Sequence, residues 1–285
     1  MTKVLFETHH LYYWPNFLPI INELKSRKKY KIEVSMPKRS SDTEENLLIK
    51  SCDSLELSFI SGKTEQIRIN KIIKSEYDVI IVGNVGQLNK IVHTKTCAVM
   101  VYHGIGLKKS YYNDIDPRIN LRSVEAEERF RRLEKDGHSN LVLTGFTKLD
   151  RLHDLEVINI LKMKEEMELD KTKKNILYAP SFYPSSLEKL APELGLLSKD
   201  YNIIIKLHGF SWEQKRYMYQ SKICIDLDKK FSCIKLLSNT EYDIIPYYRI
   251  ADLLISDISS TLFEFLPLNR PIIQANCFSL RLKHK

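Results

Sequence analysis

One segment of the sequence brings a histidine, two glycines and two lysines close together. Residues 102–109 read Tyr-His-Gly-Ile-Gly-Leu-Lys-Lys, and His103 directly follows an apolar stretch that predicts a buried strand. In an open α/β sheet, ligands bind in the loops that follow the carboxyl ends of strands. Gly104 and Gly106 would let the backbone approach a ligand, His103 offers a base near neutral pH, and the lysine pair that begins with Lys108 could hold a phosphate. The alternative is a glycine turn with a hydrogen-bonded histidine and solvated lysines.

A second histidine stands in the corresponding place in the other half of the chain. Residues 201–207 read Tyr-Asn-Ile-Ile-Ile-Lys-Leu, and His208 and Gly209 follow them. If the strand is regular to its end, Lys206 and His208 lie on the same face and offer two cationic groups to a phosphate. A lone histidine of this kind is more often structural, but two in corresponding places favour a chemical role.

A third segment is rich in hydroxyl groups. Residues 251–261 read Ala-Asp-Leu-Leu-Ile-Ser-Asp-Ile-Ser-Ser-Thr, which predicts a buried strand followed by the start of a helix. The hydroxyls of Ser259, Ser260 and Thr261 and the first N–H groups of the helix would converge where an anion could sit. Asp257 would hold the turn or contact a ribose. Ordinary helix capping by Ser259 is the alternative.

Two further segments follow expected strands. Pro180 ends the apolar run Ile-Leu-Tyr-Ala and places Ser181 at the same edge of the sheet, although a proline that simply ends a strand is the slightly favoured interpretation. Residues 9–14, His-His-Leu-Tyr-Tyr-Trp, follow the first expected strand. They either line an acceptor site or pack as ordinary core and interface aromatics.

Alternating strands and helices must position these segments. The hydrophobic pattern predicts strands over residues 3–8, 31–35, 55–60, 78–82, 98–102, 140–144, 175–179, 201–207, 252–256 and 271–274, with a strand near 233–237, and helices that include 15–27, 64–74, 152–169, 187–199, 211–220 and 260–266. Such alternation implies parallel sheets covered on both faces. We therefore expect an α/β protein with two doubly wound, Rossmann-like domains, residues 1–170 and 171–285. Two such domains facing one cleft resemble the GT-B architecture of nucleotide-sugar transferases.

The composition of the chain excludes several classes of protein. The 285 residues include 44 Lys and Arg against 36 Asp and Glu, a formal net charge of +8. The hydrophobic fraction of 43% excludes a disordered chain, and no apolar run approaches the roughly 18 residues that cross a bilayer. The start of the chain has no pattern of a secretory signal, so a cytoplasmic protein is expected. Its basic residues are interleaved with acidic ones and no nucleic-acid motif is present, so nucleic acid is not an expected partner.

Four of these segments, in this order, resemble motifs of the CDP-glycerol glycerophosphotransferase family, which makes and primes teichoic-acid-type polymers. They are the His103-Gly104 loop with its lysines, the Leu-Tyr-Ala-Pro strand end, Lys206-Leu207-His208 and, above all, residues 252–260. The match spans residues 95–275, whereas the first ninety or so residues fit only the fold.

The resemblance implies a GT-B enzyme in which His103 and His208 are the catalytic or phosphate-handling histidines. It also implies that Ser259 and Ser260 bind the nucleotide diphosphate. Glu264 stands where the family has an aspartate and belongs to the expected substrate-binding residues.

The expected reaction moves a glycerol-phosphate or related polyol-phosphate unit from a CDP-alcohol donor. An acceptor hydroxyl attacks the β-phosphorus and CMP leaves; His103 accepts the proton, while His208, Lys206 and the serine-rich helix start neutralise the diphosphate. No metal or other cofactor is expected. The acceptor would be a lipid-linked or cell-surface glycan. The basic surface favours the anionic inner leaflet, where each Lys or Arg contributes roughly 1 kcal/mol, so we expect peripheral attachment at the inner membrane face.

Two alternatives remain at this point. One is a GT-B glycosyltransferase that uses a sugar nucleotide with the same two histidines. The other is a non-catalytic relative that keeps a nucleotide site, because the chain departs from the family pattern at Ile105-Gly106 and Gly209 and stops soon after residues 271–274. We accordingly expect the second domain to be short at its C-terminal end.

Overall fold

The chain forms two compact units, residues 1–150 and 151–285. The structure, a computed structural model, describes all residues except 39–40, 107–115, 155–156 and 277–285. Lys108 therefore lies outside the described residues.

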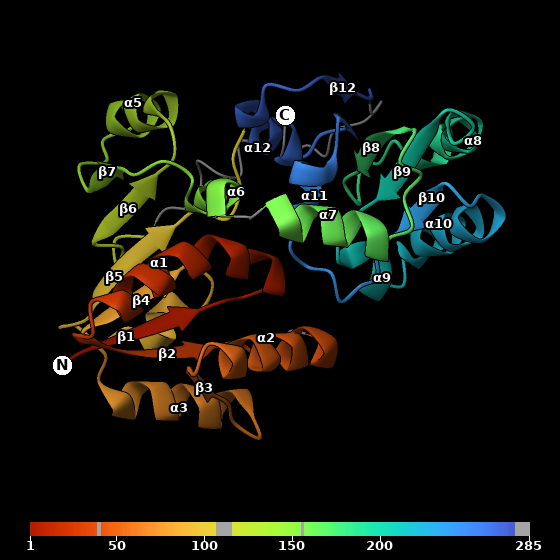
Figure 1. Cartoon of the computed structure of the whole chain (residues 1–285). Helices are drawn as coiled ribbons and strands as arrows, with labels where there is room; N and C mark the ends of the chain where they lie inside the picture. Colours follow the sequence, from red (N-terminus) through yellow and green to blue (C-terminus); the bar gives the residue numbers. More distant parts are fainter. Residues whose placement is uncertain (39–40, 107–115, 155–156, 277–285) are drawn as a thin grey trace. The chain divides into compact units, whose positions relative to one another are not determined.

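The first unit is built on a seven-stranded parallel sheet, counted over the residues that the structure describes, in the order β3-β2-β1-β4-β5-β6-β7 (Figure 1). The order reverses between β1 and β4, and this reversal creates a topological switch point at the carboxyl ends of these two strands. The strands are β1 (Thr2–Glu7), β2 (Tyr30–Ser35), β3 (Ser58–Ile60), β4 (Val79–Val82), β5 (Cys97–Val101), β6 (Leu121–Val124) and β7 (Leu141–Leu143).

Two helices of the first unit begin at residues that supply capping side chains. Ser41 accepts a hydrogen bond from the backbone N–H of Glu44, and Thr64 does the same for Ile67. The elements are η1 (Leu11–Tyr13), α1 (Trp14–Ser26), α2 (Asp42–Ser54), α3 (Glu65–Ser75), α4 (Leu88–Ile91), α5 (Glu127–Lys135) and η3 (Thr147–Asp150). They cover a core that includes Leu5, Ile80 and Met100, all almost fully buried.

The second unit contains a five-stranded parallel sheet within its described residues, in the order β10-β9-β8-β11-β12, and its order reverses between β8 and β11. Its strands are β8 (Lys174–Ala179), β9 (Tyr201–Ile205), β10 (Ile234–Leu236), β11 (Leu253–Ser256) and β12 (Ile272–Gln274). Its helices are α6 (Arg151–Asp154), α7 (Val157–Glu166), α8 (Leu187–Leu197), α9 (Phe210–Glu213), α10 (Met218–Lys230), α11 (Ile245–Ile250), α12 (Thr261–Phe265) and η4 (Leu266–Leu268). Both units are thus doubly wound, and the predicted fold class is confirmed.

The boundary between the units lies earlier than the position expected from the polar run at residues 170–174. The helical segment before that run belongs to the second unit, because Arg151 forms an ion pair with Asp243 and Arg249 Nη1 donates to the carbonyl of Leu152 at 3.1 Å. On the other side, Thr147 Oγ1 donates to the carbonyl of Asn16 at 2.7 Å and ties η3 to α1. The boundary between the two units therefore follows from the contacts of these segments, and not from the polar run at residues 170–174.

Several local predictions differ from the structure. The helix expected over residues 211–220 is two helices, α9 and α10, and α10 continues to Lys230 with Cys224 fully buried. The helix expected over 152–169 consists of α6 and α7. Strand β6 was not expected at all. It contains Arg122, a charged side chain that is buried and donates to the hydroxyl of Tyr102 at 3.2 Å.

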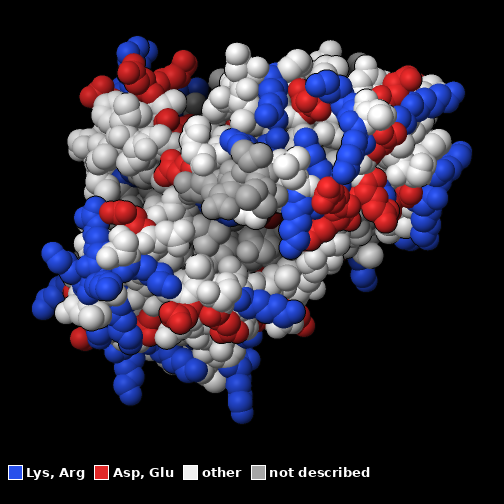
Figure 2. Space-filling model, in the orientation of Figure 1, with Lys and Arg blue, Asp and Glu red and all other residues white. Residues whose placement is uncertain are grey.

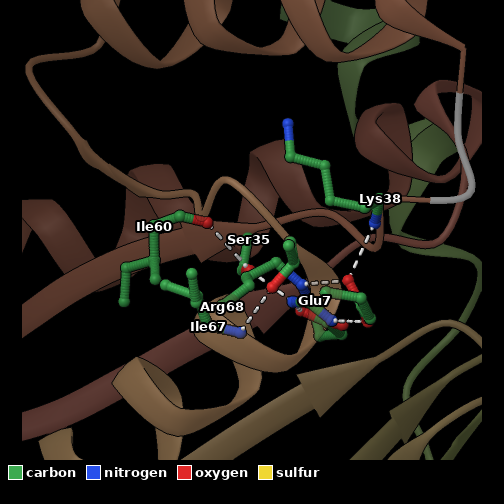
Figure 3. Close-up of polar contacts among 8 residues, drawn as sticks. Glu7, Ser35, Lys38, Ile60, Ile67 and Arg68 are labelled. Atoms are coloured by element: carbon green, nitrogen blue, oxygen red, sulfur yellow. Dashed lines mark hydrogen bonds and ion pairs between the residues drawn. The ribbon is translucent and has the colours of Figure 1, made fainter.

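A buried ionic cluster lies at the carboxyl ends of β1, β2 and β3 (Figure 3). Arg68 of α3 donates from Nη1 to Glu7 Oε2 at 2.9 Å and to Ser35 Oγ at 2.6 Å, and from Nη2 to Glu65 Oε1 at 2.7 Å. The side chains of Arg68 and Glu7 are both 0% exposed. Burial raises the pKa of the Glu7 carboxyl, while the charge of Arg68 opposes that rise. The cluster fixes α3 against the edge of the sheet from which the first unit's candidate site is built.

No helix in the described part of the chain combines the length and the apolar character that crossing a bilayer would require.

Candidate functional site

The first unit's candidate site lies at its topological switch point. His103 follows β5 as predicted, and its ring Nδ1 lies 2.7 Å from the carbonyl oxygen of Gly83, the residue after β4. The ring of Tyr13, which comes from the segment after β1, stacks on the His103 ring with centroids 4.0 Å apart and planes 18° apart. Loops from three adjacent strands therefore meet at one half-buried histidine.

The contact with Gly83 assigns the tautomer of His103. A carbonyl oxygen can only accept a hydrogen bond, so Nδ1 must carry the proton. In the neutral ring, Nε2 then holds the lone pair that can accept a proton. The geometry therefore prepares His103 to act as a base through Nε2.

The other histidines near this site differ from His103. Burial lowers the pKa of His9 to about 4, so its ring is neutral near pH 7 and is not ready to take up a proton. His10 lies with Nδ1 3.3 Å from Glu44 Oε2 and stacks on the ring of Tyr12. His103 stays the candidate base because of its place after β5 and the contact of its Nδ1 with Gly83.

The loop after His103 is held by an arginine that was not among the predicted site residues. Gly104 is buried, and its carbonyl accepts a hydrogen bond from Arg129 Nη2 at 3.4 Å. Arg129 also pairs with Glu125 at 3.0 Å, with its guanidinium 4.7 Å from the centroid of the Tyr102 ring. In the sequence, the i, i+4 spacing of Glu125 and Arg129 could have indicated this ion pair. Gly106 has a φ of +110°, a conformation that favours glycine.

The second unit places Ser181 and Asp257 together at its own switch point. Asp257 Oδ1 accepts hydrogen bonds from the backbone N–H and the hydroxyl of Ser181 at 2.7 and 2.6 Å. Its Oδ2 accepts from the backbone N–H and the hydroxyl of Ser186, both at 3.0 Å. Asp257 is 0% exposed, so the carboxylate holds the loop after β8. These contacts tie Asp257 to the loop after β8, and its contact with a ribose stays a prediction.

His208 has the opposite tautomer to His103. Its Nδ1 accepts a hydrogen bond from the backbone N–H of Phe210 at 3.1 Å, so the proton of the neutral ring is on Nε2. The rings of Phe182 and Phe210 contact it with centroids 4.8 and 4.9 Å away. His208 is therefore prepared to donate a hydrogen bond from Nε2, as a partner for phosphate oxygen would.

Lys206 does not share a strand face with His208, because β9 ends at Ile205. Its Nζ lies 3.2 Å from the carbonyl oxygen of Leu207. The two residues are nevertheless in one short loop at the carboxyl end of β9, next to β8.

The hydroxyl-rich segment follows β11 as predicted. Ser259 and Ser260 are half-buried, and Ser259 Oγ accepts a hydrogen bond from the backbone N–H of Thr261 at 3.3 Å. The hydroxyl of Thr261 lies 2.8 Å from that of Ser256. Glu264 is buried at 3% exposure and accepts a hydrogen bond from the Tyr248 hydroxyl at 2.8 Å. The role of Ser259 toward a diphosphate stays a prediction.

The predicted site residues thus form two groups, one in each unit. His103, Gly104 and Gly106 follow β5 of the first sheet. The second group, which follows β8, β9 and β11 of the second sheet, consists of Ser181, Lys206, His208, Asp257, Ser259, Ser260, Thr261 and Glu264. Over the described residues, no three His, Cys, Asp or Glu side chains are grouped so that they could hold a metal ion.

Comparison with known proteins gives one family match and several relatives. The model of the family described as CDP-Glycerol:Poly(glycerophosphate) glycerophosphotransferase matches residues 123–277, more than half of the chain. A teichoic acid poly(glycerol phosphate) polymerase of Bacillus spizizenii is 28% identical over 213 residues, which cover 62% of this chain and 51% of the relative. A teichoic acid glycerol-phosphate transferase of Staphylococcus aureus is 30% identical over 148 residues, covering 46% of this chain and 33% of the relative. The chain thus spans about half the length of the first relative and about a third of the second.

Solved structures share the fold. The UDP-GlcNAc 2-epimerase from Neisseria meningitidis has a TM-score of 0.68 at 16% identity, covering 96% of this chain and 82% of that one. The wall teichoic acid polymerase TagF has a TM-score of 0.64 at 18% identity, covering 95% of this chain and 69% of that one. At these identities, the likeness establishes the arrangement of strands and helices.

Proposed function

Because the chain belongs to the CDP-glycerol:poly(glycerophosphate) glycerophosphotransferase family, as its four ordered motifs predicted, we propose that it transfers a glycerol-phosphate unit from CDP-glycerol to a hydroxyl acceptor. The family match begins at residue 123, after the His103 loop. The role of the first unit therefore depends on its own geometry.

The opposite tautomers of the two histidines are the observation that carries this proposal. Transfer requires a base for the acceptor hydroxyl and hydrogen-bond donors for the phosphate oxygens. His103 offers a proton-accepting Nε2 because Gly83 holds its Nδ1, and His208 offers an Nε2–H because its Nδ1 is bound to Phe210. One histidine of each kind fits the division of labour that the chemistry needs.

In the proposed step, the acceptor oxygen attacks the β-phosphorus of CDP-glycerol. A phosphodiester bond forms to the acceptor, the bond from the β-phosphorus to the bridging oxygen breaks, and CMP leaves with that oxygen. The acceptor proton goes to His103 Nε2. His208, Lys206, Ser259 and Ser260 stabilise the negative charge of the diphosphate, the role that electrostatic groups have in phosphoryl transfer.

The acceptor that we propose is a lipid-linked or cell-surface glycan, handled at the inner face of the membrane. Figure 2 shows lysine and arginine side chains gathered over the part of the first unit near the N-terminus, where Figure 1 shows β1 beginning. Lys3, Lys29 and Lys31 are exposed there, at the amino ends of β1 and β2. Each basic residue near an anionic surface contributes roughly 1 kcal/mol to membrane attraction.

Membrane binding is tested by sedimentation with vesicles. We expect the protein to sediment with phosphatidylglycerol vesicles, to remain in solution with phosphatidylcholine vesicles, and to bind less when Lys29 and Lys31 are changed to Glu. The matched control changes Lys162 and Lys171 to Glu, which alters the net charge equally on exposed residues of the second unit. Equal loss in both variants, or no sedimentation of the unchanged protein, would refute binding through this surface.

The transferase proposal is tested by nucleotide release from a panel of donors. The protein is incubated with CDP-glycerol, CDP-ribitol or sugar nucleotides, with and without a lipid-linked acceptor fraction. We expect CMP release that depends on both CDP-glycerol and the acceptor. Release of a nucleotide from sugar nucleotides alone would show a glycosyltransferase, and nucleotide binding without any release would show a non-catalytic relative; either result overturns the proposal.

A further inference from the structure

Tyr13 has contacts that set it apart from the other aromatic residues after β1. It is 3% exposed, its ring stacks on His103 at 4.0 Å, and its hydroxyl accepts a hydrogen bond from Asn84 Nδ2 at 2.8 Å. Tyr12, by contrast, is half-buried and meets the His103 ring edge-on at 5.8 Å. Buried in this way, Tyr13 contacts the candidate base rather than presenting a surface to a substrate.

Gly83 links Tyr13 to the tautomer of His103. A Cβ atom at position 83 would lie 2.5 Å from Tyr13 Cδ2, closer than real side-chain contacts allow. The missing side chain therefore makes room for the Tyr13 ring. The carbonyl of the same residue receives the proton of His103 Nδ1. One backbone position thus both accommodates Tyr13 and selects the nitrogen of His103 that carries the proton.

We propose that Tyr13 is a positioning residue that holds the His103 ring on the carbonyl of Gly83, and so directs Nε2 toward the acceptor hydroxyl. This inference rests on the proposed transferase function. The stacked ring occupies the space into which the imidazole would otherwise turn. Asn84, which follows Gly83 directly, fixes the outer end of the tyrosine ring through its hydroxyl.

Without the Tyr13 ring, the fold should no longer determine which nitrogen of His103 carries the proton. In a Tyr13→Leu variant, the imidazole can rotate away from Gly83, and Nδ1–H and Nε2–H forms should both be populated. Misplacing a catalytic group by about 1 Å can cost on the order of 10²-fold in rate. We therefore expect kcat to fall by about 10–100-fold, while the KM for CDP-glycerol stays within about twofold because the donor contacts lie in the second unit.

The experiment combines nitrogen NMR of the histidine rings with kinetics. The His103 signals are assigned by their loss in a His103→Asn variant, and spectra are recorded at a pH where the ring is neutral. The unchanged protein and Tyr13→Phe, which keeps the stacked ring, should show the Nδ1–H form. Tyr13→Leu and Gly83→Ala, which displaces the ring by a different route, should show a mixture of forms and the loss in kcat.

Retention of the pure Nδ1–H form in folded Tyr13→Leu and Gly83→Ala would overturn the positioning role, as would a Tyr13→Phe variant as impaired as Tyr13→Leu. Thermal unfolding of each variant confirms that a folded protein is compared. The NMR result is independent of turnover. An absence of CMP release from the unchanged protein would refute the transferase function, whereas the tautomer comparison would still decide the role of Tyr13.

Discussion

Replacing His103 with alanine is expected to lower kcat for acceptor-dependent CMP release by about 10²–10⁴-fold, the usual contribution of a positioned general base. The dissociation constant for CDP-glycerol should change little, because the groups proposed to hold the diphosphate follow strands of the second sheet. Steady-state kinetics and calorimetric titration of the donor measure the two effects separately.

A matched control for this prediction is His93→Ala, because His93 is exposed and makes no contact proposed to serve the reaction. Its kcat should equal that of the unchanged protein. His208→Ala should instead weaken donor binding as well as lower kcat, since it removes the group that we propose donates a hydrogen bond to phosphate. A His103→Ala variant with full activity would contradict the assignment of the base.

Replacing Arg68 with alanine is expected to reduce the free energy of unfolding by roughly 3–5 kcal/mol, because breaking a buried ion pair leaves an uncompensated charge. Arg68 is the partner of the fully buried Glu7 and also binds Ser35 and Glu65. Urea unfolding followed by circular dichroism measures the loss as a lower midpoint of the transition.

The comparison variant is Arg131→Ala, which breaks the exposed ion pair between Arg131 and Glu127 on α5. Exposed pairs contribute little, so its urea midpoint should barely move. Replacing both buried partners, Arg68→Met with Glu7→Gln, should cost less than Arg68→Ala alone, since the double change leaves a neutral group at position 7. Equal effects of Arg68→Ala and Arg131→Ala would show that the buried cluster does not stabilise the first unit.

The fold could be predicted from the sequence because parallel strands that are buried on both faces consist of continuous apolar residues. Runs such as residues 203–205 and 79–82 appear as strands in the structure. Strand β6 escaped prediction because the buried Arg122 interrupts its apolar pattern. The extent of α10 depended on tertiary packing of Cys224 and its neighbours, which local periodicity does not contain.

The candidate site was predictable only in part. His103 and His208 were identified because each directly follows an apolar strand. Their tautomers could not be predicted. The hydrogen-bond acceptor of His103 Nδ1 is the carbonyl of Gly83, which lies in the loop after a different strand. The same limit applies to Asp257, whose carboxylate binds Ser181 across a sequence separation of 76 residues. Contacts of this kind are set by strand order, which residue types alone do not reveal.

The most direct test of the proposed chemistry follows one oxygen atom. The protein and the acceptor are incubated with CDP-glycerol that carries oxygen-18 in the bridge between its two phosphorus atoms. The masses of both products are then measured by mass spectrometry. Attack at the β-phosphorus should deliver the label to CMP, in a one-to-one ratio with the new phosphodiester. Label retained in the transferred glycerol phosphate, or release of CDP in place of CMP, would contradict the proposed transfer.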